Sequence, residues 1–427
     1  MRIAIIALGS QGDVQPYIAL GKGLKEAGQF VRLVTHENFE ILVKSHGLEF
    51  WPVKGNVKDI VQSKEMREVL EKGNFLSITL QMAKQGGQNI AIDWAKAALA
   101  ACQGMDMILT GIGGLYLGLS LAEKLGLPLL QAYVFPITPT KDFPGVIFSK
   151  SLSRLGSSFN RFSHHLTRQI LWQPLRSGDK RARKQVLGLP PAPFWGPYNA
   201  DRLHNYPTLY GFSPSVIPKP SDWENNINVT GYWFLDSASD WTPPSALMEF
   251  LESGSPPIYI GFGSMSNRNP EETADICLQA LTETKQRAVM LSGWGGLHKA
   301  NLPDTIFMVD SIPHSWLFSR VGAVVHHGGA GTTAAGLRAG VPSIVIPFFG
   351  DQLFWGQRVA ELGVGTEPIP RKKLTVDRLA KAIQKAVTDQ TMRQRAANLG
   401  ARIQSEDGIA KVVAVVQDIE KHGATYR

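Results

Sequence analysis

Short apolar runs alternate with helical patterns along the chain, and this alternation limits the possible folds more than any other feature of the sequence. In the first half, a glycine turn at 9–16 leads into a segment at 17–28 whose apolar side chains recur at helical spacing. Four runs there have the composition of buried strands, namely residues 2–8, 30–36, 105–111 and 127–134. Strands that alternate with helices predict a parallel, doubly wound sheet.

The second half of the chain repeats this arrangement, with a helix pattern near 271–284. Its strand patterns lie at 256–265, 287–293, 305–312, 322–329 and 342–348. A stretch rich in proline, asparagine and serine, residues 213–244, reads as the linker region. We therefore predict an α/β protein with two Rossmann-like domains facing across a cleft, at 1–225 and 226–407. The tail, 408–427, contains a helix too apolar to be exposed, and we expect it to pack back on the first domain.

Composition describes a folded globular chain of 427 residues, of which 44% are hydrophobic and 19% charged. The two cysteines, Cys102 and Cys277, lie far apart in sequence, so we expect neither a disulfide framework nor a cysteine-based metal site, and a cytoplasmic location fits. The longest uncharged runs have 16 residues and are broken by glycine or proline, so no membrane span is predicted. The net charge of +8 indicates an anionic partner.

A glycine-rich run, residues 326–333 ("HHGGAGTT"), connects a strand pattern to a helix pattern. A helix N-terminus has unpaired N–H groups, and glycines let a phosphate approach them, so the run predicts an anion site. Thr332 and Thr333 could add hydroxyl donors, and His327 an imidazole donor. The alternative is a tight turn in which Thr332 only caps the helix.

A second polar pair follows the next strand pattern, within "PFFGDQLFWG" at 347–356. Asp351 and Gln352 offer acceptors and donors suited to the vicinal hydroxyls of a sugar, at the sheet edge where ligands bind. The alternative is a capped turn with the neighbouring aromatic side chains in the core, and for the aromatics we favour the core. Phosphate donors and a hydroxyl-reading pair a short loop apart predict a nucleotide-sugar site.

The same stretch resembles the donor-binding signature of inverting family 1 glycosyltransferases with the GT-B fold, and especially that of sterol 3-beta-glucosyltransferases. The turn "GSQGDVQPYIALGKGL" at 9–24 is similar to the "GSRGDVQP" turn of these relatives, and the likeness covers essentially the whole chain. Gln11 stands where many relatives have arginine, and Ser311 where plant relatives stack a tryptophan on uracil; Trp294 could replace it.

The resemblance implies a role for each matching residue. His327, Gly329, Gly331 and Thr332 would contact the diphosphate, and Asp351 with Gln352 would hold the sugar. Three further positions are implied near the nucleotide, Ser264 at the phosphates and Pro313 with His314 at the base.

Asp13, on the turn after the first strand, is the candidate catalytic base. Transfer with inversion requires removal of the acceptor hydroxyl proton as the oxygen attacks C1, and a carboxylate can accept that proton. The alternative role of Asp13 is to cap the following helix. His36, at the end of the second strand, is the next candidate.

Metal ligands at recognisable spacing are lacking, because the pairs His164–His165 and His326–His327 are adjacent in sequence. We expect no cofactor and no metal requirement. Residues 150–184 gather lysines and arginines among apolar side chains. Such a segment could rest on an anionic membrane or cover the acceptor pocket; no nucleic-acid motif accompanies it.

Together these features predict an enzyme that transfers glucose from UDP-glucose to the hydroxyl of a sterol or similar lipophilic acceptor. An alternative is a glycosyltransferase acting on a polyketide, flavonoid or triterpene with a UDP- or TDP-sugar. A nucleotide-sugar sensor without turnover is a third hypothesis. Asp13 distinguishes it from the enzymes, because a sensor has no use for a base.

Overall fold

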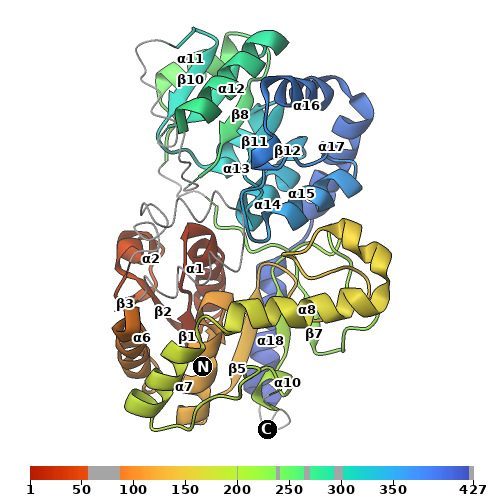
Figure 1. The fold of residues 1–427 in the computed structure, drawn as a ribbon. Helices are drawn as coiled ribbons and strands as arrows, with labels where there is room; N and C mark the ends of the chain where they lie inside the picture. The colour runs from red at the N-terminus through yellow and green to blue at the C-terminus, as the bar shows by residue number, and fades with distance from the viewer. Residues whose placement is uncertain (56–86, 200, 237–240, 264–269, 293–301, 423–427) are drawn as a thin grey trace. The chain divides into compact units, whose positions relative to one another are not determined.

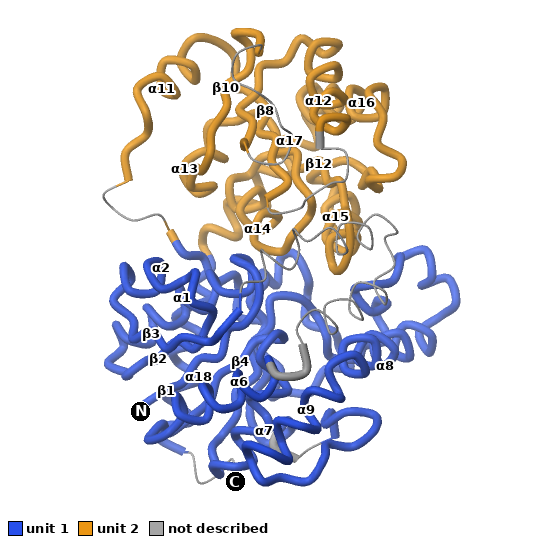
Figure 2. The backbone as a smooth tube through the Cα atoms, turned by 60° about the vertical axis from the view of Figure 1, so that its left-hand side comes forward, with its two compact units in different colours: residues 1–60, 75–235, 406–427 blue, residues 61–74, 236–405 orange. Residues whose placement is uncertain are grey.

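The computed structural model describes residues 1–55, 87–199, 201–236, 241–263, 270–292 and 302–422. The predicted site residues Ser264 and Trp294 lie outside the described residues. The chain divides into two compact units, coloured separately in Figure 2. The described residues up to Leu235 and those from Glu406 onward form the first unit, and the second runs from Asp236 to Ser405.

A parallel sheet of seven strands forms the centre of the first unit, in the order β3-β2-β1-β4-β5-β6-β7 (Figure 1). The strands are β1 Arg2–Ile6, β2 Phe30–His36, β3 Glu49–Val53, β4 Met107–Thr110, β5 Leu129–Tyr133, β6 Thr208–Tyr210 and β7 Ile227–Val229. All residues of β4 and β5 are buried, as expected for strands covered by helices on both faces.

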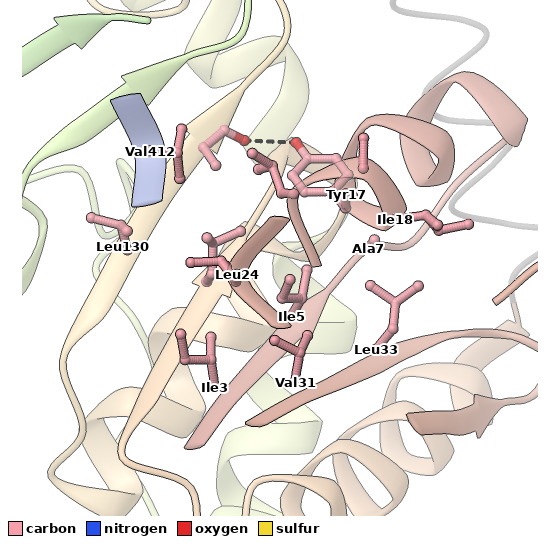
Figure 3. Packing of buried hydrophobic residues seen from close by; sticks show 14 of the residues in the cluster. Ile3, Ile5, Ala7, Tyr17, Ile18, Leu24, Val31, Leu33, Leu130 and Val412 are labelled. Atoms are coloured by element: carbon pink, nitrogen blue, oxygen red, sulfur yellow. Dashed lines mark hydrogen bonds between the residues drawn. The ribbon is translucent and has the colours of Figure 1, made fainter. Parts of the chain in front are cut away.

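Helices connect these strands and cover the sheet. They are α1 Gln11–Glu26, α2 Glu40–Ser45, α6 Gly87–Ala101, α7 Leu115–Leu125, α8 Ser157–Trp172, α9 Arg176–Ala182, α10 Asp201–His204 and α18 Gly408–His422. Figure 3 shows Ile3 and Ile5 of β1 in one buried cluster with Leu24 of α1 and with Val412 of the tail helix α18. Val416 and Ile419 of α18 belong to the same cluster. The tail helix therefore completes the core of the first unit.

The first unit extends past the predicted boundary at 225. Strand β7 begins at Ile227 and pairs with β6, so ten residues assigned to the second domain by sequence belong to the first. The expected linker at 213–244 is not a simple connector, because it contains β7 and the buried side chains of Trp223 and Trp233.

The second unit contains a parallel sheet of five strands in the order β10-β9-β8-β11-β12. These are β8 Ile258–Gly261, β9 Ala288–Leu291, β10 Ile306–Val309, β11 Ala323–His326 and β12 Ser343–Val345. Its helices are α11 Ser245–Glu252, α12 Pro270–Thr284, α13 His314–Leu317, α14 Ala330–Ala339, α15 Gln352–Glu361, α16 Val376–Thr388 and α17 Gln390–Gln404. Each predicted strand of both halves is present, which confirms two Rossmann-like domains. Among the described residues, no helix is both long and apolar enough to span a bilayer.

Candidate active site

Both sheets reverse their strand order at one point, and Asp13 and the 326–333 turn follow strands that flank these points. In the first sheet the reversal falls between β1 and β4, and in the second between β8 and β11. Ligands of open α/β sheets bind outside the carboxyl ends of the strands at such reversals. Asp13 follows β1 and His327 follows β11, so each belongs to the expected binding edge of its own unit.

The turn from β11 into α14 is built around a buried histidine. His326 is fully buried, and its Nδ1 accepts a hydrogen bond from the backbone N–H of Gly328 at 3.1 Å. Gly328 has φ +88°, and a β-carbon there would lie 2.6 Å from Cγ1 of Val345. Glycine is therefore required at 328, and the turn it makes leaves the next histidine, His327, at the start of the loop.

The N-terminus of α14 is open. Gly329 is the N-cap residue, and the first intrahelical bond runs from the N–H of Thr333 to the oxygen of Gly329 at 2.9 Å. The N–H groups of the three residues between them therefore have no partner within the helix. Apart from its chain neighbours and the backbone of its own helix, no heavy atom of the described residues lies within 4 Å of the position that a β-carbon would take at Gly331, so these residues leave the backbone open to a ligand.

The two threonines differ in their surroundings. Thr332 is half-buried, so its hydroxyl group remains a candidate phosphate donor. Thr333 is fully buried, and its Oγ1 makes no hydrogen bond within the described part of the chain. Thr333 therefore belongs to the interior of the helix packing.

Two histidines near this helix are held uncharged. Burial, and to a smaller extent the nearby His314, lower the pKa of His327 to about 4. Burial also lowers the pKa of His314 to about 4. The His314 ring stacks on Phe318 with centroids 4.4 Å apart, and its Nε2 pairs with the Tyr259 hydroxyl at 3.2 Å. A neutral His327 has a single ring N–H, so it acts toward an anion as a hydrogen-bond donor rather than as a cation.

Pro313, the other residue implied at the base, is the N-cap of α13 with φ −63° and ψ 121°. Its carbonyl accepts the N–H of Trp316 at 3.1 Å and that of Leu317 at 3.0 Å. The side chain of His314 is thus packed into the second unit. A nucleobase at this position would be contacted by backbone atoms. The role of the 313–314 pair stays a prediction.

The loop between β12 and α15 positions Asp351 and Gln352 differently. Asp351 is the N-cap residue of α15, and its Oδ2 accepts a hydrogen bond from Nε1 of Trp355 at 2.8 Å. Oε1 of Gln352 accepts from the backbone N–H groups of Phe348 at 2.7 Å and Phe349 at 3.1 Å. The Gln352 residue is only 4% exposed, so its carbonyl organises the loop itself. Trp355 is fully buried, which agrees with a core role for this aromatic.

Asp13 is the third residue of α1 and is bound to the residue that caps the helix. Its Oδ2 accepts hydrogen bonds from the backbone N–H and from the hydroxyl of Ser10, each at 2.9 Å. Burial raises the pKa of the Asp13 carboxyl above its ordinary value, although the two Ser10 donors lower it. Gly9 has φ +145°, and a β-carbon there would lie 2.5 Å from Oδ2, so glycine is required beside this carboxyl.

Known protein families match both halves of the chain. Residues 3–144 match the glycosyltransferase family 28 N-terminal domain, and residues 288–419 match the erythromycin biosynthesis protein CIII-like, C-terminal domain. A sterol 3-beta-glucosyltransferase of Arabidopsis thaliana is 37% identical over 97% of this chain and 67% of its own length. The chain belongs to the sterol 3-beta-glucosyltransferase family.

Fungal members of the sterol 3-beta-glucosyltransferase family are longer. The chain is 38% identical to the one from Aspergillus fumigatus over 98% of this chain, but it spans only 30% of that protein. Solved structures show the same fold at lower identity. The glycosyltransferase of kitacinnamycin superimposes with a TM-score of 0.67 at 19% identity, and SsfS6 of Streptomyces sp. SF2575 with thymidine diphosphate gives 0.63 at 20%; both alignments cover 98% of this chain. These matches confirm the predicted GT-B fold.

The structure adds a cluster to this family member that the sequence did not predict. Tyr133 ends β5 and Tyr210 ends β6, and their rings lie 5.9 Å apart at the carboxyl edge of the first sheet. The hydroxyls of Tyr116 and Tyr198 hydrogen-bond to each other, and the guanidinium of Arg168 lies 5.0 Å from the Tyr198 ring. Tyr133 lies in a strand that the sequence predicted, but Tyr210 ends β6, which it did not predict, so no signal in the sequence placed the two side by side. The cluster surrounds the guanidinium of Arg168 with aromatic side chains at this edge.

His36 lies at the end of β2 and is 1% exposed, 5.5 Å from the Trp94 ring. Neither ring nitrogen has a hydrogen-bond partner among the described residues, and burial lowers its pKa. Burial thus favours the neutral form of His36, whereas the side chain of Asp13 is held by two hydrogen bonds from Ser10. Which of the two residues acts as a base stays a prediction. Within the described ranges, no group of three or more His, Cys, Asp or Glu side chains is placed to hold a metal ion.

Proposed function

We propose that this protein transfers glucose from UDP-glucose to the hydroxyl of a sterol, with inversion at C1. The observation that carries the proposal is the open N-terminus of α14 beside the uncharged His327, in a chain 37% identical to a plant sterol 3-beta-glucosyltransferase. Unpaired N–H groups with a neutral imidazole donor suit a diphosphate that must bind and then leave.

Donor binding in this proposal is divided between two loops of the second unit. The N–H groups at Ala330 to Thr332, together with His327, would hold the diphosphate, and Asp351 would hold the glucose hydroxyls. The helix dipole and these donors would meet the diphosphate charge, so the proposal includes no metal and no cofactor. Gln352 would act by shaping the loop that presents Asp351, since its carbonyl accepts two backbone N–H groups of that loop.

Asp13 would act as the base. The acceptor oxygen forms its bond to C1 while its proton passes to Oδ1 of Asp13, and the bond from C1 to the phosphate oxygen breaks with its electron pair leaving on UDP. Ser10 holds Oδ2, and no described residue hydrogen-bonds to Oδ1. The raised pKa makes the carboxylate a better proton acceptor than a fully solvated aspartate.

Sterols are held in membranes, so in a cell the proposed enzyme would meet its acceptor at a bilayer. We therefore include a cytoplasmic location with peripheral attachment to anionic membranes in the proposal. The excess of basic residues at 150–184 supports it.

The test is to incubate the protein with UDP-glucose or TDP-glucose and with a panel of sterols and flavonoids, and to detect products by mass. We expect steryl glucoside from UDP-glucose, and none from the Asp13→Asn variant above background. Products confined to flavonoids or to TDP-glucose would support the natural-product alternative. Binding of UDP-glucose without turnover on any acceptor would support a sensor.

A further inference from the structure

Helix α8 packs against the rest of the first unit with a polar face. Its buried residues at the middle of the helix are Asn160, Ser163, His164 and Thr167, which share one face by their spacing. These side chains hold the preceding segment, because Nδ2 of Asn160 donates to the oxygen of Lys141 at 2.9 Å and Oγ of Ser163 accepts from the N–H of Gly145 at 2.8 Å. These hydrogen bonds, together with ring contacts such as Phe143 against His164, fix this part of the helix to the first unit.

The opposite face of α8 presents apolar side chains outward. Phe162 is 59% exposed and Leu166 is 39% exposed, one helical turn apart. Eight large hydrophobic side chains are exposed among the described residues, and six of them lie between 155 and 195, namely Leu155, Phe162, Leu166, Leu175, Phe194 and Trp195. Their grouping in one short region is unlike the scattered exposure of ordinary surfaces.

Two glutamines join the 190–199 loop to this outer face. Gln169 and Gln173 follow Phe162 by seven and eleven residues, which places them on the same side of the helix. Nε2 of Gln169 donates to the oxygen of Trp195 at 2.7 Å, and Nε2 of Gln173 to the oxygen of Phe194 at 2.9 Å. The rings of Phe194 and Trp195, 51% and 69% exposed, therefore continue the apolar surface of Phe162 and Leu166. We call these four residues the α8 patch.

The charge of the chain is concentrated in the same region. Residues 150–184 contain nine of the 44 lysines and arginines but only one acid, Asp179. Arg183 is buried and paired with Glu123, whereas five of the cations are exposed, namely Lys150, Arg154, Arg161, Lys180 and Lys184. Arg161 on α8 is exposed beside Phe162, and the guanidinium of Arg176 lies 4.3 Å from the Phe194 ring. An apolar patch with exposed cations at its edge is suited to insertion among anionic lipid headgroups.

We propose that the α8 patch docks on the surface of an anionic lipid bilayer, with Phe162 and Trp195 inserted at the headgroup level and Arg161 contacting lipid phosphates or carboxylates. A second copy of this chain fits the surface poorly, because a symmetric contact would bring the exposed cations of two basic regions together. The inference specifies the membrane contact in the proposed function. Vesicle binding tests this inference without any measurement of catalysis. If the proposed glucosyl transfer proved wrong, the docking inference would not be affected.

The experiment is sedimentation of the full chain with phosphatidylcholine vesicles, with and without phosphatidylserine, at low and high salt. We expect binding to the phosphatidylserine vesicles that weakens with salt. F162A/W195A should reduce binding at least ten-fold, and Arg161→Gln about five-fold. Matched controls are Ile41→Ala, which removes a side chain 85% exposed on α2, and Lys411→Gln on α18; both should bind as the parent does.

Three results would overturn the proposal. One is no binding to anionic vesicles at low salt, and another is equal losses in the patch variants and the controls. The third is self-association in analytical ultracentrifugation that F162A/W195A abolishes without any vesicle binding, which would assign the patch to a second copy. Melting curves of F162A/W195A should match the parent, because both side chains are exposed. In addition, glucosylation of a sterol dispersed in detergent should stay within two-fold of the parent in this variant, whereas glucosylation of a sterol in anionic vesicles should fall.

Discussion

Oδ2 of Asp13 accepts both the backbone N–H and the hydroxyl of Ser10, each at 2.9 Å. Two donors on one oxygen fix the carboxyl plane at the start of α1 and leave Oδ1 without a hydrogen bond from the described residues. The contact is also the side-chain half of a helix cap, so the structure shows the capping role that the sequence suggested for this residue, while its role as the base stays a prediction. The first two predictions separate them.

Asp13→Asn should abolish turnover while preserving the fold. Asparagine keeps an oxygen that can accept from Ser10 but cannot accept the acceptor proton, so we expect kcat to fall about 10²- to 10⁴-fold. Because burial raises the pKa of Asp13, the fold favours the uncharged carboxyl, and the neutral amide should melt at or above the temperature of the parent at pH 7. The measurements are kcat at saturating UDP-glucose and a melting curve. A kcat within a few-fold of the parent would leave Asp13 with the capping role alone and make His36 the next base to test.

Ser10→Ala should shift the pH dependence of turnover upward. The Ser10 hydroxyl lowers the pKa of Asp13, so its removal raises that pKa further above 3.8. The base works only when deprotonated, hence kcat decreases as the pH falls through this pKa, and the acid limb should lie at higher pH in Ser10→Ala. Ser10→Thr retains a hydroxyl and serves as the control, with the parent's profile expected. An acid limb at the same pH in all three proteins would mean that another group limits the rate.

Asp351→Ala should weaken UDP-glucose binding about 10- to 150-fold and leave UDP binding nearly unchanged, because the carboxylate would contact only the sugar. His327→Ala should instead weaken both ligands alike. Calorimetry with each ligand measures the difference. Trp355→Phe is the matched control, since it removes the indole donor to Oδ2 of Asp351 and keeps the carboxylate. If Asp351→Ala weakened UDP and UDP-glucose equally, its assignment to the sugar would be wrong.

The sequence predicted the long apolar strands because their burial on both faces shows as continuous runs, such as residues 2–8. It did not predict β6 and β7, which have three residues each and lie in a polar, proline-rich stretch. Their pairing depends on distant partners, as in the hydrogen bond from the N–H of Thr208 to the oxygen of Asn226. The residues around each strand show no sequence pattern that reveals such a contact. The predicted domain boundary at 225 was therefore placed too early.

The glycine turn at 326–333 was predictable because backbone chemistry dictates it. The orientation of Gln352 was not, since it depends on the N–H groups of Phe348 and Phe349 converging on one oxygen. The orientation of α8 also contradicts what hydrophobic patterning alone would suggest. Its polar residues turn inward because the peptide groups of the preceding segment, including the N–H of Gly145, need partners there.

The packing of the tail helix gives a stability prediction. Helices α1 and α18 approach each other closely at Gly23. A β-carbon there would overlap Cγ2 of Ile409 in α18. Gly23→Ala would stabilise an isolated helix by about 0.5–1 kcal/mol, but here overpacking should destabilise the protein by about 1–3 kcal/mol. Ile409→Ala removes the overlapping methyl group, so the double variant should be more stable than the sum of the single changes indicates.

Urea unfolding of the four proteins, namely the parent, the two single variants and the double variant, measures this coupling free energy. Gly28→Ala places its added carbon more than 4 Å from any side chain of the described residues and controls for the loss of a glycine, although its φ of +87° adds strain of its own. Additive free energies for Gly23 and Ile409 would show that α1 and α18 do not pack against each other at this point, and the tail helix would then not be part of the core of the first unit.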